Sequence, residues 1–488
     1  MFVQNSSRHL RVLLPCQRKP ALTSSAVFHK LEMVPCEGNI RTPIARYNTS
    51  AIHRNLDQSV QVDARKAGAY LYPTLKPEPL NVVSAKGTTV VFSNGKTIED
   101  TTCGAAVACV GYDNKRIGEE LAAELINGTN GEMSKVYLMC SGAEAMESAM
   151  KMARQYYMEL RPRQTHRTNF IARQGSYHGS TLGALSMGGH VGRRKLFEGM
   201  LLDNNVHRVS AANEYRGKAD GQTTEEYVQQ LADELDQKFQ EVGPDTVAAF
   251  VAETLVGATL GTVPAPPGYF KAMKKVCDKY GALLILDEVM CGLGRCGSLH
   301  EWEQEGVVPD IQTVAKGLAG GFAPMAAMFI NHRVSDALMA GTGVFSHGHT
   351  YQGHPVGCAA ALEVQRIIRE ENLVENVRKN GQHLGKLLHE QLDDHPYVGN
   401  IRGRGFFWSI EFVGDKKTKE PFPPSAGIAK KVHLAALNDV GISLYPGMGT
   451  KDGVAGDHVW VGPAYNSTKE YIERIVGKVK DSVVLALD

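Results

Sequence analysis

Short apolar runs alternate with segments of helical character between about residues 134 and 330, and this alternation constrains the fold more than any other feature of the chain. The helical segments are expected at 143–160, 223–241 and 268–279. The apolar runs are Lys135–Cys140, Asn169–Ala172, Val247–Glu253, Leu283–Val289, Ile311–Lys316 and Ala326–Ile330. Strand–helix alternation of this kind predicts an α/β fold, in which helices cover both faces of a mainly parallel sheet.

Smaller elements are expected on both sides of this region. Residues 82–100 alternate around the turn sequence Ser93-Asn94-Gly95-Lys96, which predicts a small antiparallel hairpin. After residue 355 we expect a long helix, a strand and two further helices, at 356–392, 406–412, 425–439 and 468–486.

The chain is too long for one ordinary domain, with 488 residues of which 43% are hydrophobic. Residues 116–355 are predicted to form a large domain that carries the ligand site. Residues 61–115 and 356–488 are predicted to form the two parts of a smaller α/β domain, and residues 1–60 an N-terminal extension.

This extension is basic and rich in serine, with eight Arg and Lys residues against three acidic ones. An Arg-rich, Ser-rich and acid-poor composition without a long apolar run is typical of a mitochondrial transit segment. Two alternatives remain open: a basic tail on a cytoplasmic enzyme, or a translation start at Met33.

Charge and cysteine content exclude several other classes of partner. The net charge of +1 provides no strong positive potential to attract nucleic acid. No apolar stretch is long enough to span a membrane. The nine cysteines form no CxxC pair and no His/Cys ligand spacing, so we expect reduced thiols and no metal site.

Three of the apolar runs end in a functional group. The run at 247–252 is followed by Glu253, the run at 283–286 by Asp287, and the run at 311–315 by Lys316. Ligands of parallel sheets bind at the carboxyl ends of the strands, and right-handed crossovers place these ends on one side. The three side chains are therefore expected to meet.

A lysine and an aspartate at this edge predict a pyridoxal 5'-phosphate site. A buried lysine can lose its proton and form a Schiff base with the cofactor aldehyde. A buried aspartate can keep the pyridine nitrogen protonated, which turns the ring into an electron sink. We therefore expect Lys316 and Asp287 to be the catalytic residues. Lys86 also follows an apolar stretch but has no acidic strand-end partner, so we interpret it as a turn lysine.

The phosphate of the cofactor needs backbone donors, and Ser141-Gly142-Ala143 joins a predicted strand to a predicted helix. A turn of small residues at a helix N-terminus offers free N–H groups and the positive end of the helix dipole. An ordinary helix cap formed by Ser141 is the alternative. With Lys316 and Asp287 in the same sheet, we favour the phosphate site.

Three further residues are candidates for contacts with the cofactor ring. Val289 lies two residues after Asp287, so both side chains are expected on one face of the strand end. Tyr177 could cover the opposite face of the ring, with His178 beside it. For Tyr177 a loop aromatic in the core, and for His178 a structural histidine, are equally open alternatives.

The spacing of these motifs resembles the class III aminotransferases, which are fold-type I pyridoxal-phosphate enzymes. The resemblance runs from about residue 70 to the C-terminus. It is carried by Leu284-Ile285-Leu286-Asp287-Glu288-Val289, Gly292-Leu293-Gly294-Arg295-Cys296-Gly297, Pro309-Asp310-Ile311 and Lys316-Gly317.

The resemblance implies that Glu253 is the glutamate that supports the site. It also implies that Thr350 reaches the phosphate of a neighbouring subunit, which would make the protein a homodimer with shared active sites. Ala143 stands where relatives often have a hydroxyl residue, and Ala455 where they often have an arginine. Arg402 remains a candidate for binding the substrate carboxylate, although it could equally brace its own turn.

The leading hypothesis for the function is transfer of an amino group from an ω-amino acid or primary amine to a keto acid such as pyruvate, in a ping-pong cycle. An aminomutase, a racemase or a decarboxylase would need the same lysine and aspartate, so these reactions remain alternatives. A scaffold without turnover has no need for the complete set of Lys316, Asp287 and Glu253. A nicotinamide-binding enzyme is excluded because no GxGxxG follows the first strand.

Overall fold

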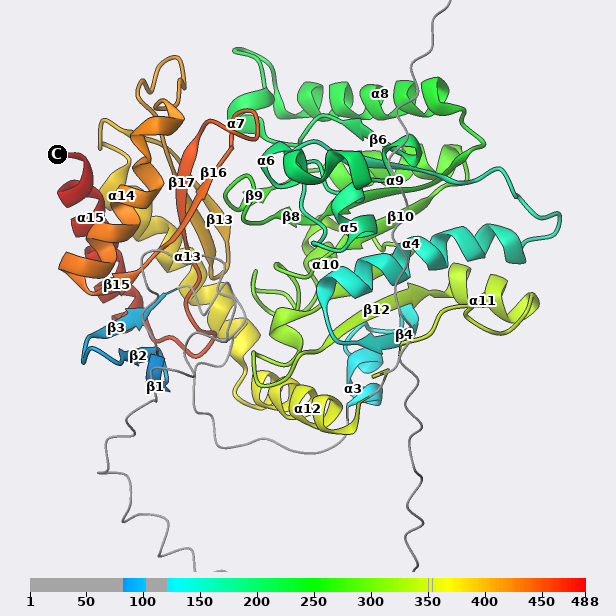
Figure 1. Cartoon of the computed structure of the whole chain (residues 1–488), viewed down its shortest axis with the longest axis horizontal. Coiled ribbons are helices and arrows are strands. Elements are labelled where there is room, and N and C mark those ends of the chain that lie inside the picture. The colour runs from blue at the N-terminus through cyan, green and yellow to red at the C-terminus, as the bar shows by residue number, and fades with distance from the viewer. Residues whose placement is uncertain (1–81, 102–120, 350, 353) are drawn as a thin grey trace, which may run out of the picture. The chain divides into compact units, whose positions relative to one another are not determined.

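The computed structural model describes residues 82–101, 121–349, 351–352 and 354–488. Its largest sheet has seven strands in the order β4-β12-β11-β10-β7-β5-β6 (Figure 1). Six of the strands are parallel to one another, and β12 is antiparallel to both of its neighbours. The bounds are β4 Met133–Met139, β5 Asn169–Arg173, β6 Val206–Val209, β7 Val247–Glu253, β10 Leu283–Asp287, β11 Ile311–Val314 and β12 Ala326–Asn331. The predicted α/β sheet is confirmed.

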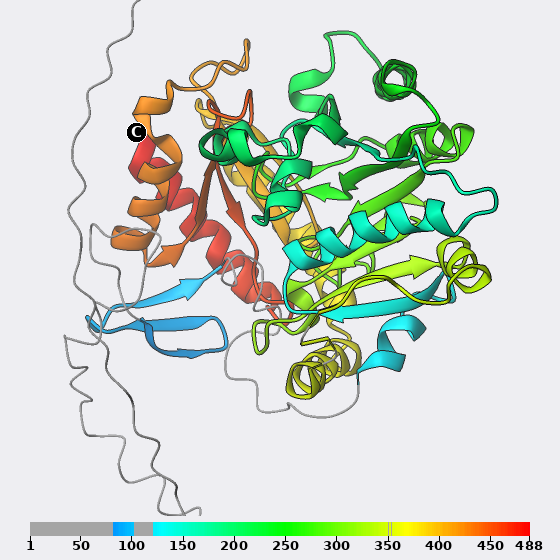
Figure 2. The ribbon, with the colours of Figure 1, turned by 45° about the vertical axis from the view of Figure 1, so that its right-hand side comes forward.

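The central strands are buried on both faces, because successive side chains point to opposite sides. Leu284 and Leu286 of β10 pack with α8 (Thr224–Val242) and α9 (Tyr269–Lys279) in one hydrophobic cluster. Leu283 and Ile285 pack with α4 (Gly142–Glu159) in another. Figure 2 shows α4 lying across its face of the sheet.

Shorter helices connect these strands or flank the sheet. They are α3 Ala122–Asn127, α5 Leu182–Met187, α6 Val191–Arg194, α7 Glu214–Gly217, α10 Glu301–Glu305 and α11 His332–Ala340, with 3-10 turns at η2 Lys195–Met200, η3 Asp203–Asn205 and η4 Lys316–Leu318. A two-stranded ribbon, β8 Leu255–Val256 and β9 Val263–Pro264, follows β7.

The C-terminal region builds a second, antiparallel sheet in the order β13-β14-β17-β16. Its strands are β13 Val398–Arg404, β14 Phe407–Phe412, β16 Tyr445–Met448 and β17 Asp457–Val461. One hydrophobic cluster joins the sheet to four helices, α12 Pro355–Glu370, α13 Leu373–Leu392, α14 Ile428–Ala435 and α15 Lys469–Leu487. The short elements η5 Pro424–Ala426 and η6 Ala436–Val440 flank α14.

The expected hairpin at 82–100 is present and gains a third strand. The strands β1 Val82–Lys86, β2 Thr89–Phe92 and β3 Thr97–Asp100 are antiparallel. β3 also pairs in parallel with β15 (Ile442–Ser443) from the C-terminal region. Backbone pairing therefore links residues before the large sheet to residues after it.

The prediction of a single long helix over 356–392 is wrong. The structure has two helices, α12 Pro355–Glu370 and α13, separated by Asn372 in the left-handed conformation at φ 52°. Asparagine tolerates this conformation better than most residues. The apolar spacing of both helices hid the break in the sequence.

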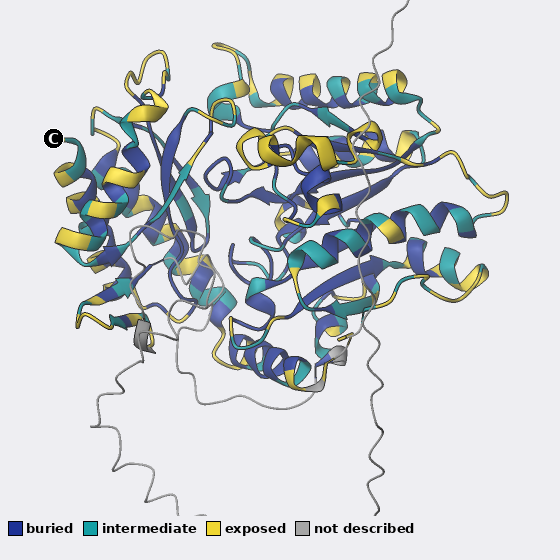
Figure 3. Ribbon diagram, viewed as in Figure 1, coloured by how far each residue is buried: buried dark blue, intermediate teal, exposed yellow. Residues whose placement is uncertain are grey.

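Buried residues concentrate in the strands and exposed ones on the outer faces of helices such as α8 (Figure 3). A local exception is the segment 196–202, where several large apolar side chains are exposed: Leu196, Phe197, Met200 and Leu202. In the described part of the chain, no helix combines the length and the apolar composition needed to cross a bilayer.

Candidate active site

The three predicted strand ends meet at the carboxyl edge of the large sheet. Asp287 pairs in register with Glu253 on one side and with Thr313 on the other, and Lys316 follows two residues after the end of β11. They line a cavity of about 420 Å³, together with Ser141, Gly142, Ala143, Tyr177, His178 and Val289. The structure thus brings every predicted cofactor contact that it describes to one cavity.

Lys316 begins the 3-10 turn η4 with φ at 41°, a left-handed conformation that is uncommon for a lysine. Such strained residues cluster at functional sites, where the surrounding structure holds them. Burial lowers the pKa of the Lys316 ammonium, and the charges of Asp287 and Glu253 counteract this only in part. A lysine with a lowered pKa is easier to convert to the neutral amine.

Asp287 is held by three neighbours. Its Oδ2 lies 2.8 Å from Nδ1 of His178, its Oδ1 accepts from the backbone N–H of Val289 at 3.0 Å, and the hydroxyl of Thr313 donates to Oδ1 at 3.4 Å. Asp287 is 4% exposed and His178 only 2%. The carboxylate therefore has a fixed orientation in a site that excludes most solvent.

The relation between Asp287 and Val289 differs from the expected strand alternation. β10 ends at Asp287, and Val289 lies in the following turn, tied to Asp287 through its N–H. Both still line the cavity. The backbone N–H reaches the carboxylate because the chain has already left the strand.

Glu253 supports the wall that Tyr177 forms. Its carboxylate accepts hydrogen bonds from the backbone N–H groups of Tyr177 at 3.0 Å and Gly257 at 3.1 Å. Burial raises the pKa of this carboxyl. The guanidinium of Arg193 lies 4.6 Å from the centre of the Tyr177 ring. Tyr177 is thus held from both the backbone and the ring.

The cradle at Ser141–Ala143 opens α4, and Ser141 also caps that helix. The Ser141 hydroxyl accepts from the N–H of Glu144 at 3.3 Å, which is the alternative role considered for it. Gly142 lies tightly against the cavity wall, because a Cβ there would come within 2.8 Å of Val289. The two interpretations of Ser141, as a helix cap and as part of a phosphate site, are compatible, since capping leaves backbone donors of the first turn free.

Comparison with known proteins agrees with this geometry. Residues 114–483 match the family Aminotransferase class-III. The chain belongs to this family. An aminotransferase of Gibberella zeae is 80% identical over 100% of both chains. Gamma aminobutyrate transaminase 3, a chloroplastic protein of Solanum lycopersicum, is 33% identical over 82% of this chain and 80% of its own.

A solved structure of the same fold is an amine transaminase from an uncultivated Pseudomonas species, in a PLP-bound form. It is 27% identical to this chain, with a TM-score of 0.78, and the match covers 86% of this chain and 99% of that one. The resemblance inferred from the motifs is confirmed, as are the fold-type I architecture and transamination as the reaction.

In this class III aminotransferase, Arg402 lies outside the cavity of Lys316. Its Nη2 lies 2.6 Å from a carboxylate oxygen of Glu411, and its Nε donates to the carbonyl of Gly261 at 2.8 Å. Nη2 also donates to the carbonyl of Leu260. These contacts tie Arg402 to the turn between β8 and β9 and to β14, and its role toward a substrate carboxylate stays a prediction.

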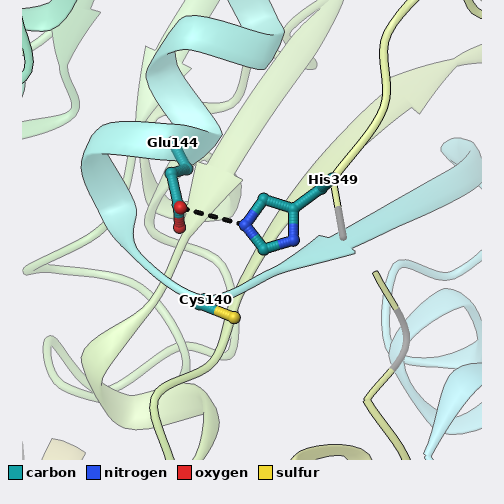
Figure 4. A group of neighbouring side chains, drawn as sticks. All are labelled: Cys140, Glu144 and His349. Carbon is teal, nitrogen blue, oxygen red and sulfur yellow. Dashed lines mark hydrogen bonds and ion pairs between the residues drawn. The ribbon is translucent and has the colours of Figure 1, made fainter. Parts of the chain in front are cut away.

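Thr350 lies outside the described residues, but the residue before it is placed. His349 Nε2 lies 2.9 Å from Oε1 of Glu144, in the first turn of α4, and Cys140 lies beside them (Figure 4). The N–H of Tyr351 donates to Nδ1 of His349, so the ring proton is on Nε2 and is donated to Glu144. This bond ties the end of the segment before Thr350 to the phosphate cradle.

The sequence did not predict that Glu288, next to Asp287, is buried and holds several surrounding segments through its carboxylate. Glu288 is 1% exposed, and its carboxylate accepts from four donors. These are the N–H groups of Glu301 and Trp302, the hydroxyl of Thr254 and the amide of Gln312. Burial raises the pKa of Glu288 to about 7. Its position directly after a strand-end aspartate was the only signal in the sequence.

Proposed function

We propose that the protein binds pyridoxal 5'-phosphate in the cavity of Lys316 and Asp287 and transfers an amino group from an ω-amino acid or a primary amine to a keto acid such as pyruvate. The observation that carries this proposal is one cavity in which a lysine of lowered pKa faces an oriented, buried aspartate. The ping-pong order follows, because donor and acceptor would use the same site in turn.

The residues present fit this cofactor. The first turn of α4 offers N–H donors and its positive dipole end to a phosphate. Asp287 offers a carboxylate to the pyridine nitrogen, and Val289 and Tyr177 offer apolar surface to the two faces of a ring. At about 420 Å³, the cavity has the size expected for a small-molecule site.

Each residue has a separate task in this proposal. When bound, the cofactor supplies an electron sink for the substrate carbon that loses its proton. Lys316, once its amine is free, holds and moves that proton, which requires the neutral amine that burial favours. Asp287 keeps a proton on the ring nitrogen, and His178 keeps Asp287 in place.

The test is an absorption spectrum of the purified protein with pyridoxal phosphate, before and after adding amines without a keto acid. We expect a visible band that an effective amine bleaches, and Lys316→Ala should lose both the band and turnover. Lys86→Ala, which removes an exposed lysine at the end of β1, is the matched control. An active Lys316→Ala enzyme would overturn the assignment.

The homodimer is part of the same proposal. The exposed apolar side chains at 196–202, of which Leu196 is 86% exposed, are suited to contact a second copy. The bond between His349 and Glu144 supports a position of Thr350 near a phosphate cradle. Light scattering of the purified protein tests this, and a monomer at micromolar concentration would argue against shared sites.

Domain boundaries and cellular location also remain proposals. Pairing of β3 with β15 supports a division into a large domain, residues 116–355, and a small domain built from residues 61–115 and 356–488. The basic composition of residues 1–60 supports import into mitochondria. A fluorescent fusion with and without these residues tests the location, and an unchanged cytoplasmic signal would favour the alternative.

A further inference from the structure

A second cavity lies further along the carboxyl edge of the large sheet. Its volume is about 640 Å³, and it shares no lining residue with the cavity of Lys316. Gln174 follows β5 and Ser210 follows β6, and both line it. The loop 449–453 between β16 and β17 closes another side. Ligands of open α/β sheets bind at this edge, and the volume suits a small organic molecule.

The lining of this cavity is strongly basic. Four cations, Arg194, Arg208, Arg216 and Lys451, line it together with one carboxylate, Asp452. Arg216 is paired with Glu411, and Lys451 with Glu420. The remaining two cations, Arg194 and Arg208, have only Asp203 as a carboxylate partner among the described residues.

Arg194 and Arg208 share a single carboxylate. Asp203 lies 2.5 Å from Arg194 but 3.8 Å from Arg208. Burial, together with the charge of Arg194, lowers the pKa of Arg208. Of the two arginines, Arg208 therefore has its charge less fully balanced by Asp203.

Two buried polar groups of the lining also lack partners. Nη2 of Arg208 donates to the carbonyls of Ser186 and Gly188, but its buried Nε has no hydrogen-bond partner among the described residues. Asn213 is 4% exposed, and its side-chain oxygen has none within the same part of the chain. Buried polar groups are nearly always hydrogen-bonded, so each such exception needs an explanation.

We propose that this cavity binds a small anion through a carboxylate or phosphate group, with Arg208 as its principal counter-charge and with a hydroxyl of the same ligand donating to the side-chain oxygen of Asn213. An arginine whose charge is only partly balanced suits either group, since the guanidinium binds both with charge-assisted hydrogen bonds. The site is separate from the catalytic cavity, so the anion acts as a second ligand of the holoenzyme.

Binding there stabilises contacts between two distant parts of the chain. The loop 449–453 lies against α6, since a Cβ at Gly453 would come within 3.0 Å of Val191. Both Gly453 and Val191 line the cavity. A ligand that binds only the folded state stabilises the folded protein. The anion would fill the space between the loop 449–453 and α6 and stabilise the protein in this way.

Isothermal titration of the holoenzyme, saturated with pyridoxal phosphate so that its cradle is filled, tests the proposal with hydrogen phosphate and with malate at constant ionic strength, since both carry a hydroxyl. We expect saturable binding of one anion per chain. Phosphate binding without malate binding assigns a phosphate ligand, the reverse assigns a carboxylate, and binding of both assigns a site that takes either group. Absence of saturable binding with both probes overturns the proposal.

Two variants and one control locate the site. Arg208→Gln should weaken binding about tenfold or more, the size expected for loss of a charge-assisted hydrogen bond. Asn213→Ala should weaken it by a smaller factor, and leaves the arginines in place if Arg208→Gln does not fold. Lys195→Gln removes an exposed cation from the neighbouring η2 without touching the lining. Equal weakening by Lys195→Gln, or unchanged binding in both site variants, contradicts the assignment.

Discussion

Asp287 acts as an oriented charge because His178, Val289 and Thr313 hold its two oxygens. Replacing Asp287 with asparagine keeps the shape and removes the charge. We expect Asp287→Asn to fold and to bind pyridoxal phosphate, but to lose activity on the order of 100-fold or more, because a neutral amide cannot keep the ring nitrogen protonated. Steady-state kcat with the best amine donor, compared with cofactor absorbance, measures the effect.

Asp439→Asn is the matched control, since it makes the same change at an exposed position of η6. Its kcat should equal that of the unaltered enzyme. An Asp287→Asn variant with full activity would remove the electron-sink role from Asp287 and leave it a structural residue.

The role of a residue could be predicted where the residue follows an apolar strand. It could not be predicted where the contact that defines the role joins residues far apart in the sequence. Lys316, Asp287 and Glu253 each follow an apolar run, so their meeting at one sheet edge was predictable. The bond between His178 and Asp287 joins residues 109 positions apart, and nothing local to His178 signals it. The locking of Arg402 by Glu411 depends on pairing between β13 and β14 in the same way.

At the scale of elements, the start of α4 depends on a residue without a side chain. A Cβ at Gly142 would lie 2.8 Å from Val289, so the turn or the valine has to move. We expect Gly142→Ala to raise the dissociation constant for pyridoxal phosphate roughly tenfold, because the displaced N–H groups no longer converge on the phosphate. Equilibrium titration of the apoenzyme with the cofactor measures it.

Gly477→Ala in α15 is the control for this substitution. No atom lies within 4 Å of a Cβ at Gly477, and alanine favours a helix over glycine by roughly 1 kcal/mol. Its cofactor affinity should not change, and its Tm should rise slightly. Unaltered cofactor affinity in Gly142→Ala would argue against the cradle.

The helix α10 carries a pH-dependent contribution to stability. Glu301 and Glu305 share the guanidinium of Arg404, and burial raises the pKa of Glu301 to about 8. A carboxyl whose pKa is higher in the folded state stabilises the fold fully below its unfolded pKa, near 4.5, and loses this contribution as pH rises through 8. Ionising Glu301 therefore costs stability at alkaline pH.

Glu301→Gln is neutral at every pH and should not suffer this loss. Between pH 5 and pH 9, we expect the Tm of the variant to gain roughly 2 °C or more on that of the unaltered protein, since about 1 kcal/mol shifts Tm by that amount in a large domain. Thermal unfolding of both proteins across this range measures the difference. Parallel curves would mean that Glu301 is ionised in the folded protein throughout.

Prediction of the elements themselves was limited by short or exposed segments. The apolar runs of the central strands are continuous because both faces are buried, and they were found. The edge strand β6 was missed, because in Val206-His207-Arg208-Val209 only the two valines are apolar. The break at Asn372 between α12 and α13 was missed because a left-handed residue leaves little trace in the apolar pattern.

At the scale of the whole described region, Glu411 links elements from distant parts of the chain. Arg216 comes from α7, beside the large sheet, and Arg402 comes from β13 of the second sheet. Thr450, from the loop between β16 and β17, also donates to Glu411 at 2.7 Å. Burial alone would raise the pKa of Glu411, but the guanidiniums of Arg402 and Arg216 hold it below its usual value.

Glu411→Gln leaves two buried guanidiniums without a carboxylate, which costs about 3–5 kcal/mol. We therefore expect a clear fall in Tm at pH 7.5. Because the pKa of Glu411 is lowered in the folded state, its contribution is fully present above its unfolded pKa, near 4.5, and is lost as pH falls through the lower pKa of the folded state. The difference in Tm between the variant and the unaltered protein should then narrow as pH falls below about 4. Glu390→Gln, which breaks an exposed pair with Lys386, should change little at either pH. A Glu411→Gln protein as stable as this control at pH 7.5 would show that the two sheets are held together without the ion pair.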